Sequence, residues 1–183
     1  MLLYHTGYQE IPRPDVRYGR KNADFGQGFY TTPDRDFALR WARERRGVPT
    51  VLNTYELRTE GLCIRYWERG ADWYDYLHDN RAGRPDALPE ADVVIGPIAN
   101  DTLYDTLGII TSGFLTRKQA TELLQLGPEY RQVVLKTDRA SEKLRWLSGE
   151  ILSPEEIERC RAVVAEEERS YQTAFAALLE KIT

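Results

Sequence analysis

Residues 24–32 read DFGQGFYTT, a pair of glycines that leads directly into four aromatic or β-branched residues. Glycine adopts the left-handed backbone that tight turns require, and Phe29 to Thr32 carry the side-chain types favoured in strands. The stretch therefore predicts a tight turn that enters a short strand. Pro33 and Asp34 follow this strand and are residue types that begin helices.

The helix predicted from Pro33 ends before Gly47 and Pro49, and its apolar residues recur at helical spacing. These residues are Phe37, Ala38, Trp41 and Ala42. Like Trp67, Trp73 and Trp146, Trp41 is interpreted as a core residue rather than as a platform on which nucleic-acid bases stack.

The remaining chain contains further strand patterns and further helix patterns. A short helix containing Leu144, Trp146 and Leu147 is expected after the last strand. Because strands and helices interleave without strict alternation, the predicted fold class is α+β. The predicted strands cover 2–5, 50–57, 62–67, 92–96 and 132–137, and the predicted helices cover 71–80 and the segment from Thr116 to the stop signal at Gly127.

Residues 153–156 read SPEE, a capping box with proline at the first helical position, which predicts a long helix over 153–182. We favour packing of its apolar stripe on the domain itself, and burial against a partner is the alternative. Glu166, Glu167 and Glu168 are expected on the solvated side. The stripe consists of Ile157, Cys160, Val164, Tyr171, Phe175, Leu178 and Leu179.

The chain has 183 residues, 42% of them hydrophobic and 30% charged, which is typical of one soluble domain with or without an appended helix. No apolar run is long enough to span a membrane, and Met1 to His5 do not resemble an export signal. Cys63 and Cys160 have no second ligand at metal-binding spacing. We therefore expect a cytoplasmic protein with reduced thiols, no metal site and no membrane contact.

The formal net charge of −4 is unevenly distributed, because residues 1–50 carry +3 and residues 51–183 carry −7. The basic N-terminal part indicates a local anion site rather than a general nucleic-acid surface. A solvated loop and a solvated helix face explain these charges equally well. The basic residues are Arg13, Arg17, Arg20, Lys21, Arg35, Arg40, Arg43, Arg45 and Arg46.

Three short pieces on or beside predicted strands together resemble the ADP-ribosyltransferase superfamily of the diphtheria-toxin and poly(ADP-ribose) polymerase type. They are LYHTG at 3–7, DFGQGFYTT at 24–32 and EYRQVVL at 129–135. The superfamily's histidine, tyrosine and glutamate-or-substitute positions match His5, Tyr30 and Gln132. With IGPIAND at 95–101, the chain also resembles, over residues 1–147, a bacterial family of ADP-ribosyltransferase-like proteins without settled function.

The resemblance implies a split β-sheet core over 1–147, followed by the C-terminal helix at 153–182. It also implies NAD as substrate and His5, Tyr30 and Gln132 as catalytic residues. His5 would bond the adenosine ribose, Tyr30 would stack on the nicotinamide, and Gln132 would hold the 2′-hydroxyl of the nicotinamide ribose. The other implied NAD-binding residues are Thr6 and Gly7, which would meet the carboxamide through backbone groups, Phe29, and Arg17 (or Arg20 or Lys21), which would meet the pyrophosphate.

Two positions depart from the superfamily pattern. Thr6-Gly7 inverts the order of small residues after the histidine. Gln132 replaces a glutamate, and a neutral amide accepts a hydrogen bond about half as strong as a carboxylate does. Glu129 lies three positions before Gln132, so on a regular strand the two side chains would point to opposite faces. Glu129 is therefore not expected to take the place of the missing glutamate.

Three functions follow as alternatives. The first is an ADP-ribosyltransferase that modifies an intracellular macromolecule, protein or nucleic acid, as the toxin of a toxin–antitoxin pair restrained by a small antitoxin protein. The second is an NAD- or nucleotide-binding module without turnover, and the third is an assembly protein that uses its C-terminal helix.

His78 is expected to be a surface or capping residue, and Asn100-Asp101 fits either a cleft position or a helix N-cap.

Overall fold

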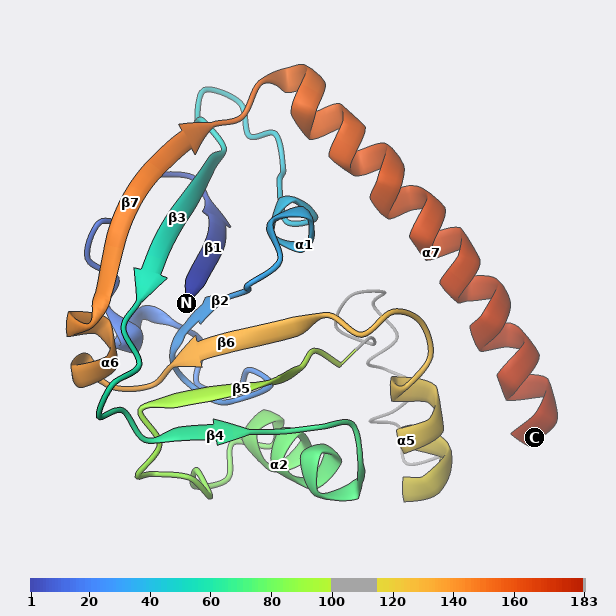
Figure 1. The fold of residues 1–183 in the computed structure, drawn as a ribbon. Helices are drawn as coiled ribbons and strands as arrows, with labels where there is room; N and C mark the ends of the chain where they lie inside the picture. Colours follow the sequence, from blue (N-terminus) through green and yellow to red (C-terminus); the bar gives the residue numbers. More distant parts are fainter. Residues whose placement is uncertain (100–114, 183) are drawn as a thin grey trace.

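The structure is a computed structural model that describes residues 1–99 and 115–182. The strands of these residues form two sheets (Figure 1). The first sheet is antiparallel, in the order β1 (Leu2–Gly7), β3 (Val51–Leu57), β7 (Leu144–Ile151). The second has the order β2 (Phe29–Thr31), β6 (Arg131–Leu135), β5 (Val93–Pro97), β4 (Ile64–Tyr66), and its β4–β5 pair is parallel.

The two sheets are joined where β2 ends. Tyr4 and Thr32 exchange two backbone hydrogen bonds, from Tyr4 N to Thr32 O (2.8 Å) and from Thr32 N to Tyr4 O (3.0 Å). The main hydrophobic core lies between the sheets and contains Leu3 and Tyr55 from the first sheet and Phe29 and Val133 from the second. The α+β class predicted from the sequence is confirmed.

Two helices begin at residues whose side chains cap them. Asp34 accepts the Phe37 amide at the start of α1 (Arg35–Leu39), and Thr116 with Gln119 forms a capping box at α5 (Arg117–Leu124). A second core cluster packs α2 (Ala71–Arg81) on the outer face of the second sheet. The other helices are the 3₁₀ turn η1 (Val16–Tyr18), α6 (Asp138–Glu142) and α7 (Pro154–Ile182).

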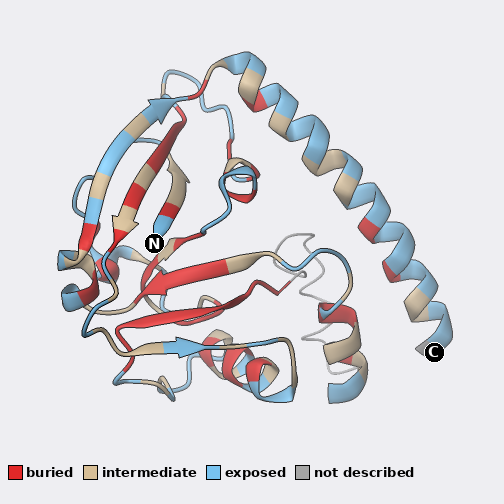
Figure 2. Cartoon of the chain, viewed as in Figure 1, coloured by how far each residue is buried: buried red, intermediate tan, exposed pale blue. Residues whose placement is uncertain are grey.

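The long helix α7 runs along one side of the molecule, past α1 to α5 (Figure 1). Near its start, Ile157 packs with Ala38 of α1, and further along, Tyr171 and Phe175 pack with Leu123 of α5. Figure 2 shows these buried positions spaced along a helix whose other positions are exposed or intermediate. These three residues of the stripe are therefore buried against the helix's own chain.

The expectation that Glu166 to Glu168 all lie on the solvated side is wrong for Glu167. The Tyr130 hydroxyl donates to Glu167 Oε1 (2.8 Å), and Arg40 forms an ion pair with the same carboxylate. Glu167 lies four positions before Tyr171, so helical periodicity places both residues on the face toward the domain.

The predicted short helix containing Leu144, Trp146 and Leu147 is also wrong, because these residues lie on β7. The helix ends earlier, at Glu142 of α6. Leu144 is buried and Trp146 donates from Nε1 to Asn53 Oδ1 (3.1 Å), whereas Leu147 is exposed. This alternation has the period of two that characterises strands.

The interpretation of Trp41 as a core residue is wrong. Helix α1 ends at Leu39, and 43% of Trp41 is exposed. The chain turns back after this point, because Thr50 Oγ1 donates to Arg43 O (2.6 Å) and Arg45 pairs with Val48 around Gly47, whose φ is +73°. Trp73 is fully buried as expected, and Trp67 and Trp146 are partly buried.

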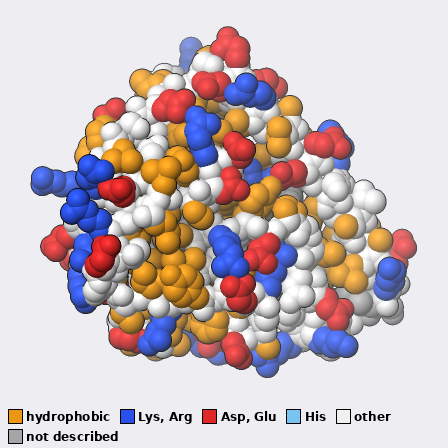
Figure 3. Space-filling model, in the orientation of Figure 1, with side chains coloured by type: hydrophobic (Ala, Val, Ile, Leu, Met, Phe, Trp, Pro, Cys, Tyr) orange, Lys and Arg blue, Asp and Glu red, His pale blue; other side chains and the backbone are white. Residues whose placement is uncertain are grey.

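Over residues 1–99 and 115–182, no helix is both long and apolar enough to span a membrane. On the face shown in Figure 3, basic and acidic side chains are interspersed with exposed hydrophobic areas. Such mixing is usual for a protein surface.

We predict that Asp92→Asn destabilises the protein by about 2 kcal/mol at pH 7, because hydrogen bonds to a buried charged group contribute on this scale. Asp92 is 4% exposed and accepts from Cys63 N (2.9 Å) and Thr137 Oγ1 (2.7 Å). Burial alone would raise the pKa of Asp92, but these hydrogen bonds outweigh it and lower the pKa.

A lowered carboxyl pKa contributes stability that is present above about pH 4 and is lost as the pH falls further. Urea unfolding at pH 7 and pH 3 should therefore show a large gap between wild type and Asp92→Asn at pH 7 and a smaller one at pH 3. An equal gap at both values would contradict the assignment to the charged carboxylate.

Candidate functional site

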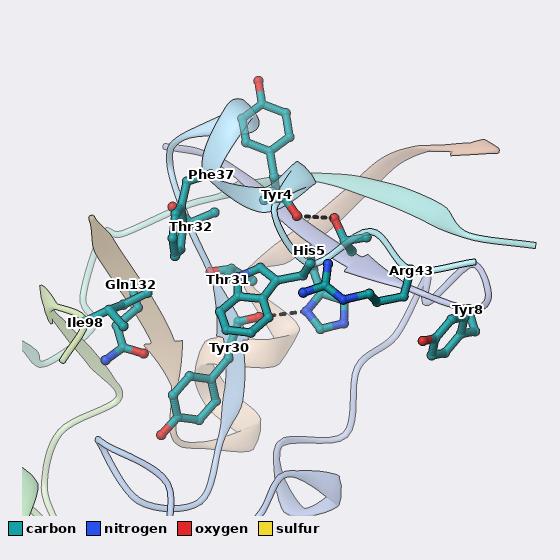
Figure 4. A pocket seen from close by; sticks show the side chains of 13 residues that line it. Tyr4, His5, Tyr8, Tyr30, Thr31, Thr32, Phe37, Arg43, Ile98 and Gln132 are labelled. Atoms are coloured by element: carbon teal, nitrogen blue, oxygen red, sulfur yellow. Dashed lines mark hydrogen bonds between the residues drawn. The ribbon is translucent and has the colours of Figure 1, made fainter. Parts of the chain in front are cut away.

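A pocket of about 450 Å³ opens where the two sheets join. We name it the Gln132 pocket. Figure 4 shows Gln132 and Ile98 toward one end and Arg43 and Tyr8 toward the other, with His5 and Tyr30 between them. The lining residues are Tyr4, His5, Thr6, Tyr8, Tyr30, Thr31, Thr32, Phe37, Ala38, Trp41, Arg43, Ile98 and Gln132.

His5 is held on β1 with one ring nitrogen committed to the protein. Its Nδ1 lies 2.8 Å from Tyr30 O, and since a carbonyl only accepts, Nδ1 carries the proton and Nε2 keeps its lone pair. Burial lowers the pKa of His5, and the hydrogen bond to Tyr30 opposes this only in part. The imidazole is therefore neutral near pH 7 and offers an acceptor at Nε2.

Tyr30 presents its ring to the pocket while its hydroxyl is used by the preceding turn. The hydroxyl donates to Gly26 O (2.7 Å) and accepts from Phe25 N (3.0 Å). Burial raises the pKa of Tyr30, so the hydroxyl stays protonated at physiological pH. Gly26 has a φ of +71°, so the turn predicted from DFGQG has the left-handed glycine that it requires.

Gln132 lies on the same face of the second sheet as Tyr30. Tyr30 pairs with Val134 in the register of β2 and β6, and Gln132 is two residues before Val134. Gln132 is 5% exposed, and its Nε2 is buried without a hydrogen-bond partner among the described residues. A buried amide that lacks a partner is costly, so its position in a pocket wall indicates a ligand contact.

A second pocket of about 550 Å³ shares His5 and Tyr30 with the first. We name it the Arg13 pocket. Phe29 lines it, with its ring centroid 4.7 Å from that of His5. The other lining residues are Gln9, Ile11, Arg13, Pro14, Asp15, Tyr18, Gly19 and Gly28.

The two residues after His5 support the pocket in different ways. Thr6 lines the Gln132 pocket and donates from Oγ1 to Ala38 O (2.6 Å), which ties β1 to α1. Gly7 adjoins the histidine, and a Cβ at this position would lie 3.4 Å from His5 Nε2, at the limit of ordinary van der Waals contact.

Arg17 does not line either pocket. It is exposed, and its guanidinium contacts Asp15 (3.0 Å) and Asp138 (3.4 Å). The cations that line the pockets are Arg13 and Arg43, which the sequence analysis counted as basic residues without assigning them to a site. Arg43 follows a helix whose early end no sequence signal marked clearly.

Carboxylates are absent from the lining of the Gln132 pocket among the described residues. Glu129 is held away from it by Arg131, whose guanidinium lies 3.1 Å from Glu129 Oε1.

A buried cluster supports the wall of the Gln132 pocket from behind. Phe37 stacks on Tyr130 at 4.3 Å between ring centroids, and the Arg40 guanidinium lies 5.5 Å from the Tyr130 ring. Glu167 of α7 binds both Tyr130 and Arg40. The long helix is thus connected to the pocket through an ion pair and a hydrogen bond.

The other polar candidates lie elsewhere. His78 is exposed and its Nδ1 lies 3.4 Å from Asp79 Oδ1, as expected for a surface residue. Asn100-Asp101 lies outside the described residues, and of the IGPIAND piece Ile98 lines the Gln132 pocket.

No curated protein matches the sequence. Residues 1–146 match a family described as "Protein of unknown function (DUF3990)", and this match covers most of the chain. The pocket residues described above, from Tyr4 to Gln132, all lie within the matched segment. The protein therefore belongs to the DUF3990 family.

Proposed function

We propose that the protein is an ADP-ribosyltransferase that cleaves NAD and transfers ADP-ribose to an intracellular macromolecule. The observation that carries the proposal is that His5, Tyr30 and Gln132 come from three different strands and line one pocket, with Gln132 Nε2 buried and unpartnered. These are the three positions at which the sequence resembles the ADP-ribosyltransferase superfamily.

The two pockets suit a bent dinucleotide. They share the wall formed by His5 and Tyr30, and each has a volume within the usual range for small-molecule sites. In our proposal the nicotinamide and its ribose occupy the Gln132 pocket, and the adenosine occupies the Arg13 pocket. His5 Nε2 accepts a ribose hydroxyl, and Arg13 and Arg43 are the cations nearest to the pyrophosphate.

The proposed reaction breaks the bond between C1′ of the ribose and the nicotinamide nitrogen. The bonding electron pair leaves with nicotinamide, so positive charge develops on the sugar. Tyr30 supports the nicotinamide ring and the Gln132 amide fixes the ribose hydroxyl. The lining of the Gln132 pocket has no carboxylate among the described residues that could deprotonate the acceptor. We therefore propose an acceptor whose attacking atom carries a lone pair before it loses a proton.

A second candidate function is NAD binding without turnover. The neutral Gln132 favours this alternative, as does the lack of a carboxylate in the lining of its pocket among the described residues, because a developing oxocarbenium ion is stabilised better by a carboxylate than by an amide.

We predict that Gln132→Ala lowers release of nicotinamide from NAD by about 100-fold, the usual effect of removing one positioned hydrogen-bonding group. Gln132→Glu should raise NAD hydrolysis, because it adds the carboxylate that the pocket lacks. The assay is nicotinamide release by the purified protein, with Gln172→Ala on the exposed side of α7 as the matched control.

Calorimetric titration with NAD separates the two functions. Binding without nicotinamide release by wild type would establish the binding module, and the absence of both would refute the assignment of an NAD site. If Gln132→Glu is no faster than wild type, the site is built around a neutral amide.

Tyr30 variants should separate the ring from the hydroxyl. Tyr30→Phe keeps the stacking surface and most activity, but it leaves Gly26 O and Phe25 N without their partner and costs about 1–3 kcal/mol of stability. Tyr30→Ala loses both activity and stability. Nicotinamide release and thermal unfolding measured on the same samples test this, and equal activity losses in both variants would mean that the hydroxyl matters to the reaction.

We further propose that the enzyme is the toxin of a toxin–antitoxin pair, since unrestrained consumption of NAD harms the host cell. Its own domain covers the buried positions of the α7 stripe, so an antitoxin would bind another surface. Induced expression of the wild type alone should arrest bacterial growth, and expression of Gln132→Ala should not. Harmless expression of an enzyme shown to be active would instead indicate a transferase with a restricted target.

A further inference from the structure

The mouth of the Gln132 pocket carries two exposed aromatic side chains. Trp41 is 43% exposed and Tyr8 is 41% exposed, and both line the pocket. Trp41 contacts Phe37 edge to face, at 6.2 Å between ring centroids. Large aromatic surfaces are usually buried, so two of them exposed at one opening indicate a binding surface.

The same mouth is basic. Residues 41–46 contain three arginines and one acidic residue in a chain of net charge −4. Arg43 is fixed in place, because its guanidinium donates to Arg40 O (2.7 Å) and Ala42 O (2.8 Å). Arg45 lies 5.5 Å from the centre of the Tyr8 ring, and both Arg45 and Arg46 are exposed, without an acidic partner among the described residues.

We propose that this mouth binds single-stranded nucleic acid as the ADP-ribose acceptor, which rests on the transferase function proposed above. Bases stack on exposed aromatic rings, and the phosphates between them bind arginine. A splayed base reaches such rings, whereas a base inside a duplex does not. Trp41, Tyr8 and Arg43 line the pocket, and Arg45 lies against the Tyr8 ring with Arg46 next in the chain. Aromatic rings and arginines therefore provide both interactions at the entrance to the pocket.

The chemistry of the pocket agrees with a base as nucleophile. A base nitrogen has a lone pair that attacks C1′ without prior deprotonation by a carboxylate. The new bond joins this nitrogen to C1′, nicotinamide leaves with the electron pair of the broken bond, and the proton of the attacking amino group passes to water. A lysine or arginine acceptor would be repelled by the arginines of the mouth.

The test measures binding of a fluorescent 12-nucleotide strand of mixed sequence, as DNA and as RNA, in the absence of NAD. We expect the protein to bind the single strand, and to bind the duplex of the same sequence more weakly. Trp41→Leu should weaken binding by about tenfold, because stacking one base contributes about 1–3 kcal/mol, and Trp41→Phe should retain most of it.

Charge reversal tests the phosphate contacts. Arg45→Glu with Arg46→Glu should weaken binding by about tenfold or more and reduce the slope of log affinity against log salt by about 1.4, the value for two phosphate contacts on a single strand. The matched control, Arg58→Glu with Lys118→Glu, changes the charge equally at exposed positions outside the pocket and should bind like wild type.

The outcomes separate this inference from the proposed function, because binding requires no NAD and nicotinamide release requires no oligonucleotide. Oligonucleotide binding that is lost in the mouth variants but kept in the control supports the inference even if NAD is not cleaved. Nicotinamide release without oligonucleotide binding, or equal weakening by control and mouth variants, would overturn it, and transfer of label from NAD to protein would then define a protein acceptor.

Discussion

The site depends on two backbone hydrogen bonds between Tyr4 and Thr32, which join one sheet to the other. They bring the end of β2 against β1, so the histidine after Tyr4 meets the carbonyl of Tyr30. The pairing of β2 with β6 then places Gln132 on the same face as Tyr30. His5, Tyr30 and Gln132 are distant in sequence, and the single Tyr4–Thr32 pair brings them to one pocket.

The polar groups of this pocket are arranged so that some are used by the protein and others are available. His5 Nδ1 and the Tyr30 hydroxyl have protein partners that fix both rings, and His5 Nε2 keeps its lone pair. Gln132 Nε2 is buried and unpartnered. Burying an amide without a hydrogen-bond partner lowers the stability of the fold, and a hydrophobic residue of similar size at this position would not carry that cost in free energy.

Local signals in the sequence predicted much of this arrangement. The glycine turn before Phe29 and the capping boxes at Thr116 and Ser153 depend on neighbouring residues only, and each is present in the structure. Strand β7 was missed because its pairing with β3 spans about ninety residues and includes a register shift between Thr54 and Tyr55. The exposure of Trp41 and the role of Arg43 depend on where the chain turns after α1, which follows from the bond between Thr50 and Arg43 and not from periodicity.

The connection between α7 and the pocket also sets an order of events during synthesis on the ribosome. Arg40 is nearly buried, and its acidic partner, Glu167, is made more than a hundred residues later. The contacts of Glu167 with Arg40 and Tyr130, which support the pocket wall from behind, therefore form only after α7 has been synthesised. Assembly of the site follows translation of its lining residues.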